Sequence, residues 1–445
     1  GAAGAVPPST EGGNGRPWRS RRMELAGLVI LAASYVAIRA ARVPAAAMAD
    51  PRSNVYASAG VATRLLTSAG VLGRYLGLMV FPRTLSADYS YRQIAAISSP
   101  LDPLFLASLA AHSALLAAGV LLLRRGRVSG VGIMLYLVAI LPASNLLVPT
   151  GKQMAERLLY LPSAGLCLAV AALFAERPLS ADRAWTRAGR AGLALVIVLL
   201  ASRAFLRNRD WADQLTLFAK TVVTSPQSAK AHYNYAHALA ARGDHVAAID
   251  QYRRALEIQD DLPEARHNLG RELLDQGDIR GAIAEIAAAA RLDPALPDVH
   301  SDLGLALARA GRDAEAEAAY RAQLSLQPGE YTANMNLGVL LLDRGAAGDA
   351  IPHLVLAVKA RPSSADARGR QILALAATGR MAEAAAALDS ALEACPDFRR
   401  MLVPFTRAAV RLGFGELARA AASRGAAAGV ALPPDLETLR SAPSP

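Results

Sequence analysis

The C-terminal half of the chain repeats every 34 residues, and this period constrains the fold more than any other feature. A glycine, an alanine and a proline each recur at this spacing. The positions are Gly243, Gly277, Gly311, Gly345, Gly379 and Gly413; Ala248, Ala282, Ala316, Ala350, Ala384 and Ala418; and Pro294, Pro328, Pro362 and Pro396, with Pro226 in phase upstream and Asp260 replacing one proline. Such self-similarity predicts a solenoid of stacked helical units.

Each recurring residue has a physical role in a pair of antiparallel helices. The small alanine lets the helices approach, the glycine permits the turn between them, and the proline ends the second helix. This is the signature of the tetratricopeptide repeat (TPR). We predict six repeats over residues 229–432, the last two capping the array. A connector half-repeat at 207–228 precedes them, and a disordered tail at 433–445 follows.

A polar row recurs on the first helix of the repeats, which lines the concave face of a TPR array. Asn234, Asn268, Asp302 and Asn336 lie 34 residues apart. A ladder of amides can donate and accept hydrogen bonds to an extended polypeptide without reading its sequence. We therefore predict these four residues to bind a polypeptide. The alternative is that they are ordinary solvated helix positions.

The sequence predicts no metal site. His232, His237 and His245 are clustered, but their spacing suits no metal-binding helix face, so packing or surface roles are favoured. Cys167 and Cys395 lie in unrelated contexts and cannot build a disulfide framework.

The N-terminal half holds most of the apolar residues of a chain that is 53% hydrophobic and only 19% charged. The uncharged apolar stretches are Leu25–Ile38, Pro103–Leu123, Val128–Gly151, Leu158–Ala175 and Ala191–Ser202. The central three have the length a bilayer requires, about 18 to 24 residues, whereas the outer two span only if flanking arginines reach the interface. The prediction is an all-α protein: a multi-pass membrane domain at 23–206, after a disordered basic segment at 1–22, followed by a TPR solenoid.

Arginine runs give this domain an orientation. The runs at 16–22, 124–127 and 177–190 flank apolar stretches and should be cytoplasmic, which also argues against nucleic-acid binding despite a net charge of +11. The stretch Ala59–Phe81 contains Arg64 and Arg74, and the crossing count is consistent only if it does not cross. We therefore expect five crossings, a re-entrant external loop at about 44–100, and extracytoplasmic repeats.

Two external loop segments carry ionisable groups beside apolar helices. One is Phe81–Ser90, with Asp88, and the other runs from Leu141 to Pro162, with Lys152, Glu156 and Arg157. Arg or Lys placed there could bind a lipid-linked phosphate. Alternatively, Asp88 caps a turn, while Glu156 and Arg157 are interfacial anchors.

Three long strings resemble one family. They are TRLLTSAGVLGRYLGLMVFPRTLSADYS, LPASNLLVPTGKQMAERLLYLPSAG and RNRDWADQLTLFAKTVVTSPQSAKAHYNYA, in order within residues 24–300. They resemble the transmembrane and tetratricopeptide repeat-containing O-mannosyltransferases and their bacterial relatives. The resemblance implies a GT-C-type membrane glycosyltransferase. Such an enzyme moves a sugar, usually mannose, from a polyprenyl-phosphate donor to Ser or Thr of a protein outside the cytoplasm, with no further cofactor identified.

The chain also departs from that family. Its members begin with further membrane helices and an early external loop with paired acidic residues, thought to supply the catalytic base. Before Met23 this chain offers Glu11 alone. We therefore expect a GT-C-like domain that is incomplete, a C-terminal portion lacking the base that deprotonates the acceptor hydroxyl.

The leading hypothesis assigns roles on this basis. Arg157, with Lys152 or Arg64, stabilises the lipid-phosphate leaving group, and the catalytic candidates Asp88 and Glu156 orient these groups or the sugar. The TPR groove presents an extended or unfolded acceptor protein to the membrane.

Two alternatives and the compartment stay open. One alternative is a non-enzymatic, membrane-tethered TPR scaffold for envelope or secretory proteins, and the other is a ligase or polymerase of lipid-linked sugars. The bilayer is a partner in each case. The membrane is a bacterial inner membrane with the repeats in the periplasm, or an endoplasmic reticulum membrane with the repeats in the lumen.

Overall fold

The computed structural model describes residues 59–82, 86, 94–146, 154, 156–176 and 183–441, with single residues at 27, 30, 34 and 37. Of residues 143, 156, 157, 183–186, 440 and 441 it describes the backbone alone. No described residue lies in a β-strand, so the all-α prediction is confirmed. The chain forms two compact units, residues 1–259 and 260–445.

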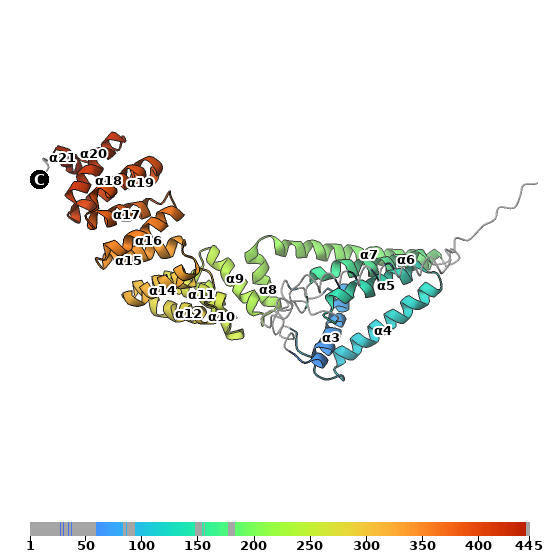
Figure 1. Ribbon diagram of the computed structural model, residues 1–445. Helices are drawn as coiled ribbons and strands as arrows, with labels where there is room; N and C mark the ends of the chain where they lie inside the picture. Colours follow the sequence, from blue (N-terminus) through green and yellow to red (C-terminus); the bar gives the residue numbers. More distant parts are fainter. Residues whose placement is uncertain are drawn as a thin grey trace, which may run out of the picture. The chain divides into compact units, whose positions relative to one another are not determined.

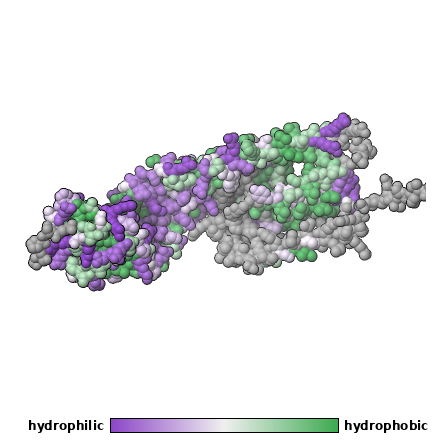
Figure 2. Space-filling view, turned by 90° about the horizontal axis from the view of Figure 1, so that it is seen from above, coloured by the Kyte–Doolittle hydropathy of each residue, from purple (hydrophilic) through white to green (hydrophobic). Residues whose placement is uncertain are grey.

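Unit 1 contains the apolar helices (Figure 1). They are α3 (Val61–Val80), α4 (Pro103–Arg124), α5 (Val128–Ile140), α6 (Tyr160–Ala175) and α7 (Arg183–Asn208). Helix α4 packs against α3 and α5, and α5 packs against α6. By length and composition, two described helices could cross a membrane: Pro103–Arg124 and the helical stretch Arg187–Trp211. Figure 2 shows hydrophobic side chains gathered over the apolar helices and hydrophilic ones over the repeats.

The predicted stretch Val128–Gly151 is not one continuous helix. Helix α5 ends at Ile140, a 3₁₀ turn covers Leu141–Ala143, and residues 147–150 lie outside the described part. Pro142 explains the break, because its ring fixes φ and it has no backbone N–H to donate. At 13 residues, α5 is only about 20 Å long. The count of five crossings therefore stays a prediction.

Helices α5 and α6 touch through their backbones. A Cβ atom on Gly132 would lie 2.4 Å from the backbone nitrogen of Ala169, and one on Gly165 would lie 2.5 Å from that of Tyr136. Small residues at such contacts let apolar helices pack without a hydrophobic driving force. Glu176 joins the same helices by capping α5: its carboxylate accepts hydrogen bonds from Ser129 N (3.2 Å) and Ser129 Oγ (2.8 Å).

The repeats form six helix pairs between Ala229 and Ala427, a stretch described without a gap. The pairs are α9 (Ala229–Ala241) with α10 (His245–Ile258), α11 (Pro263–Asp275) with α12 (Ile279–Leu292), α13 (Val299–Arg309) with α14 (Asp313–Leu326), α15 (Tyr331–Asp343) with α16 (Ala347–Ala360), α17 (Ala365–Ala377) with α18 (Met381–Ala394), and α19 (Pro396–Arg411) with α20 (Gly415–Ala427). Helix α21 (Pro434–Ser441) follows them, and α8 (Gln214–Thr224) precedes α9 and packs against it. The TPR fold predicted from the period is confirmed.

The roles predicted for the recurring residues are confirmed too. All six turn glycines have positive φ, from 72° at Gly311 to 85° at Gly277, where a side chain would be strained. All six recurring alanines are fully buried. The proline role changes at the end: Pro294, Pro328 and Pro362 follow a helix, whereas Pro396 begins α19.

Between α11 and α17, unit 2 curves with its first helices inside. Successive first helices, α11, α13, α15 and α17, contact one another directly, whereas α12, α14 and α16 have no comparable contacts among themselves. The closer spacing places the first helices on the concave face, as expected for a TPR array.

Candidate functional site

Arg64 is the one predicted donor-binding residue whose side chain the structure describes. It lies partly buried on α3, and its Nε atom is buried without a hydrogen bond to any described residue. Asp88 and Lys152 lie outside the described residues. Glu156 and Arg157 begin a 3₁₀ turn, Glu156–Leu159. The structure describes the backbone of these two residues but not their side chains. The predicted grouping of Arg64 with Arg157 and Lys152 therefore stays a prediction.

A polar network crosses the apolar helices around α3. Thr67 Oγ1 accepts a hydrogen bond from Ile97 N (2.9 Å), and Ser108 Oγ donates to a carbonyl of α3. His112 Nδ1 lies 2.8 Å from the Ser108 carbonyl oxygen, and its Nε2 lies 2.8 Å from the hydroxyl of the fully buried Tyr136. Polar groups inside an apolar helical region are costly and mark functional sites by default. Ser108 and His112 within the stretch 103–123 were the available signal, which the sequence interpretation missed.

Two residues that follow α3 contact the segments that lead into the first repeat. Ser86 Oγ and Ser225 Oγ are 2.7 Å apart and both residues are buried, although 139 positions separate them. At the end of α7, Arg203 Nε donates to the carbonyl of Pro82 (3.2 Å). Pro82 and Ser86 thereby lie against segments that precede the first repeat.

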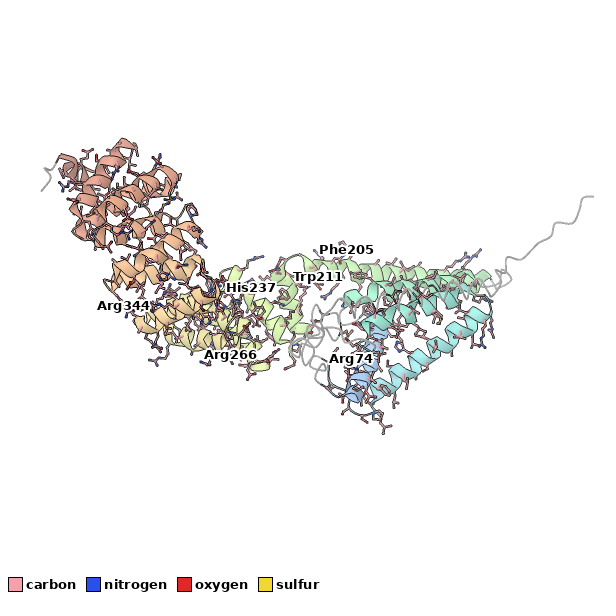
Figure 3. The ribbon with its side chains drawn as sticks, viewed as in Figure 1. Arg74, Phe205, Trp211, His237, Arg266 and Arg344 are labelled. Atoms are coloured by element: carbon pink, nitrogen blue, oxygen red, sulfur yellow. The ribbon has the colours of Figure 1, made fainter. Side chains whose placement is uncertain are left out.

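A charged cluster stabilises the junction between α7 and α8. The Asp210 carboxylate lies 3.1 Å from Arg207 NH1 and also pairs with Lys220. The side chains of Arg207 and Asp210 are only 12% and 13% exposed. Phe205 and Trp211, labelled in Figure 3, precede Arg207 and follow Asp210 in the sequence, and both are exposed.

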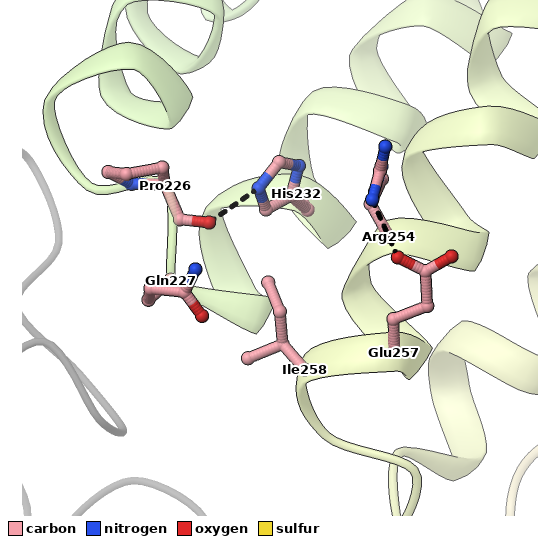
Figure 4. A pocket seen from close by; sticks show the side chains of 6 residues that line it. All are labelled: Pro226, Gln227, His232, Arg254, Glu257 and Ile258. Carbon is pink, nitrogen blue, oxygen red and sulfur yellow. Dashed lines mark hydrogen bonds and ion pairs between the residues drawn. The ribbon is translucent and has the colours of Figure 1, made fainter.

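A pocket of about 470 Å³ lies just after Ser225 (Figure 4). Its lining is Pro226, Gln227, His232, Arg254, Glu257 and Ile258. His232 Nε2 lies 3.1 Å from the Pro226 carbonyl oxygen, and Arg254 pairs with Glu257 at 2.8 Å. His232 thus has the packing role predicted for it.

The His232 contact belongs to a series that repeats every 34 residues. In five repeats, one side chain on the first helix bonds the carbonyl oxygen of the residue six positions earlier, at 2.7–3.1 Å. These side chains are His232, Arg266, His300, Asn334 and Arg368. The bond closes the loop that enters each repeat. Sequence reasoning missed it because the residue type changes while only the ability to donate is kept.

His353 extends this series in the fourth repeat, where its Nδ1 lies 3.1 Å from Asn334 Oδ1. Burial, and then the charge of Arg321, lower the pKa of His353, while Asp349 opposes them. The His353 imidazole therefore binds a proton more readily in the unfolded chain than in the folded one. The free energy of unfolding is highest above about pH 7 in this respect, and it falls as the pH drops.

We expect this loss to develop between about pH 7 and pH 5. The His353→Gln variant should lose less stability over that range, since glutamine cannot titrate. Gln251 already occupies the equivalent place, bonded to His232 at 2.8 Å. Thermal unfolding at several pH values measures this, and identical pH profiles for both proteins would contradict the assignment.

The four predicted ladder residues occupy equivalent, half-buried positions on α9, α11, α13 and α15. Asp302 Oδ2 lies 2.7 Å from His267 Nε2 and 3.4 Å from Arg271 Nε. Burial raises the pKa of Tyr320 to about 12. The hydrogen bond between Tyr320 and Asn336 acts in the opposite direction and lowers this pKa. All four residues thus lie on first helices of the repeats, while polypeptide binding stays a prediction.

The fold therefore defines an α-helical protein in which an apolar helical region is joined to a TPR solenoid. Residues 51–116 match the family model "Protein O-mannosyl-transferase TMTC, DUF1736", and residues 199–263, 267–331 and 335–397 match the tetratricopeptide repeat. The resemblance to TMTC protein O-mannosyl-transferases predicted from the sequence is thus confirmed.

Curated relatives agree with these matches. Protein O-mannosyl-transferase Tmtc3 of Drosophila melanogaster is 38% identical over 27% of this chain and 13% of its own length. Mouse TMTC1 is 31% identical over 44% of this chain and 22% of its own length. Human TMTC3 is 30% identical over 45% of this chain and 22% of its own length. The chain thus spans about a fifth or less of the length of these relatives.

Solved TPR structures also match. YrrB, described as a TPR protein with an unusual peptide-binding site, is 21% identical, with a TM-score of 0.36 over 40% of this chain and 93% of YrrB. Similarity at this level says nothing about what this chain binds.

Proposed function

We propose that this chain is part of a membrane glycosyltransferase that moves a sugar from a polyprenyl-phosphate donor to Ser or Thr of an extracytoplasmic protein. The observation that carries the proposal is Arg64, whose Nε is buried without a partner among the described residues. Arg64 lies within residues 51–116, which match the TMTC family model. A buried arginine in an apolar region is costly unless an anion pairs with it.

In this proposal the donor phosphate pairs with Arg64, assisted by Arg157 and Lys152. A phosphate that leaves as an anion gains most from fixed donors in a site that excludes water, because the charge develops as the sugar departs. Asp88 and Glu156 orient the sugar or these cations.

The TPR groove holds the acceptor as an extended polypeptide and presents it at the membrane surface. The contact between Ser86 and Ser225 supports this, because it holds Ser86 against the linker to the first repeat. In our proposal both face the extracytoplasmic phase, in a periplasm or an endoplasmic reticulum lumen.

Transfer of radiolabelled mannose from dolichyl-phosphate mannose to acceptor protein, by the full-length enzyme in membranes, tests the donor site. Removing one donor that stabilises a developing anion costs about 10²–10³ in rate, and we expect such a loss for Arg64→Ala and Arg157→Ala. Arg74→Ala is the matched control, since Arg74 is exposed on the same helix (Figure 3). Wild-type turnover in Arg64→Ala would show that this residue does not belong to the donor site. A full-length protein that transfers no sugar would favour the scaffold alternative.

A further inference from the structure

One rung of the polar ladder differs from its neighbours within unit 2. Asn268 on α11 and Asn336 on α15 carry amides, which can both donate and accept a hydrogen bond. Asp302, at the equivalent place on α13, carries a carboxylate, which can only accept. A polypeptide that bonds each rung in the same way would lack a donor at the third repeat.

The missing donor lies next to Asp302, on the preceding first helix. Arg271 Nε is 3.4 Å from Asp302 Oδ2, the oxygen that is also 2.7 Å from His267 Nε2. The Arg271 side chain is 60% exposed and that of Asp302 is 19% exposed, so solvent reaches both. Asp302 Oδ1 makes no hydrogen bond to any residue that the structure describes.

This arginine is absent from the next three first helices. At the place of Arg271 stand Leu305, Val339 and Leu373 on α13, α15 and α17, and then Arg407 on α19, which pairs with Asp435. Within unit 2, the helix that precedes the carboxylate rung therefore carries a guanidinium at this place, whereas α13 and α15, which precede the next two repeats, carry apolar side chains. Of the rungs Asp302 and Asn336, only the acidic one thus follows a helix with an arginine at this place.

We propose that Asp302 and Arg271 form a composite rung that binds the main chain of an extended polypeptide. Asp302 Oδ1 accepts a backbone N–H, and the guanidinium of Arg271 donates to a backbone carbonyl. The pair thereby supplies the two functions that one asparagine amide supplies at Asn268 and Asn336. This deepens the acceptor-binding role and rests on the proposed function.

The ligand follows from the charges of the pair. Because the carboxylate and the guanidinium largely offset each other, neither a cationic nor an anionic side chain gains much at this site. The neighbouring rungs are neutral amides. A main chain matches all three rungs, and this favours unfolded segments of any composition over a charged recognition motif.

Fluorescence anisotropy of the full chain in detergent, with an uncharged, end-blocked Gly-Ser-Thr peptide, tests the composite rung. Asp302→Ala should weaken binding about tenfold, the effect of losing one hydrogen bond of about 1.4 kcal/mol. The double variant Asp302→Asn with Arg271→Leu reproduces the neighbouring repeats and should bind within about threefold of wild type. Helical content and thermal unfolding verify that each variant is folded.

Other outcomes separate the possible failures. If Asn268→Ala weakens binding and Asp302→Ala does not, the groove binds polypeptide but the composite rung is wrong. If wild type binds only a peptide containing lysine, and Asp302→Asn abolishes this, the site reads a cation and the proposal is overturned. If wild type binds none of the peptides, both the groove role and the composite rung fall.

Discussion

Gly132→Val is expected to break the packing of α5 against α6. A Cβ atom there would lie 2.4 Å from Ala169 N and 2.7 Å from the Gly165 carbonyl oxygen. Both neighbours are backbone atoms of a helix, so no side chain can rotate away, and the helices must separate. Overpacking costs about 1–3 kcal/mol where side chains can adjust, and we expect about 3 kcal/mol or more here.

Heating the protein in mild detergent, followed by size-exclusion chromatography, measures this effect. A loss of about 3 kcal/mol corresponds to a midpoint lowered by roughly 10 °C in a domain of this size. Gly165→Val should behave alike, because its Cβ would lie 2.5 Å from Tyr136 N.

The matched control is Gly192→Val on α7. No atom lies within 4 Å of the position where its Cβ would be, so the same valine meets open space within an apolar helix. Equal heat resistance of Gly132→Val and Gly192→Val would show that α5 and α6 do not pack as described.

The period of the repeats, but not the ends of the membrane helices, could be predicted from sequence. Gly311 and Ala316 each recur at five equivalent positions. The sequence therefore locates both the turn between the two helices of a repeat and the contact between them. Almost every residue in Val128–Gly151 is apolar, so the hydropathy pattern does not indicate where a helix ends. The one local signal was Pro142, directly after the end of α5 at Ile140.

The candidate site could likewise be predicted only where its residues follow the period of the repeats. Asn268 and Asp302 were found because they stand in phase with the repeat. The pairing of Asp302 with Arg271 was not predicted, because it joins two repeats and depends on how α11 and α13 pack. The contact between Ser86 and Ser225 is a tertiary contact between distant segments, for which neither serine has a local signal.

Gly304→Leu is expected to cause a large loss of stability in the third repeat. A Cβ atom on Gly304 would lie 2.5–2.9 Å from three ring carbons of Tyr320. Tyr320 is 1% exposed, so its ring has no free space to move into. Leucine adds three further carbons at this contact, and we expect a cost of about 3 kcal/mol, at the upper end for overpacking.

Because each repeat contacts only its neighbours, the loss should be local. Hydrogen–deuterium exchange of the full chain should therefore quicken first in α13 and α14, and less in α19 and α20. Gly348→Leu is the control, since its Cβ would meet no atom within 4 Å and α16 should gain up to about 1 kcal/mol in helix propensity. Adding Tyr320→Ala to Gly304→Leu makes room and should recover part of the loss. If the double variant is as unstable as the sum of its single changes, the effect of Gly304→Leu does not come from the contact with Tyr320.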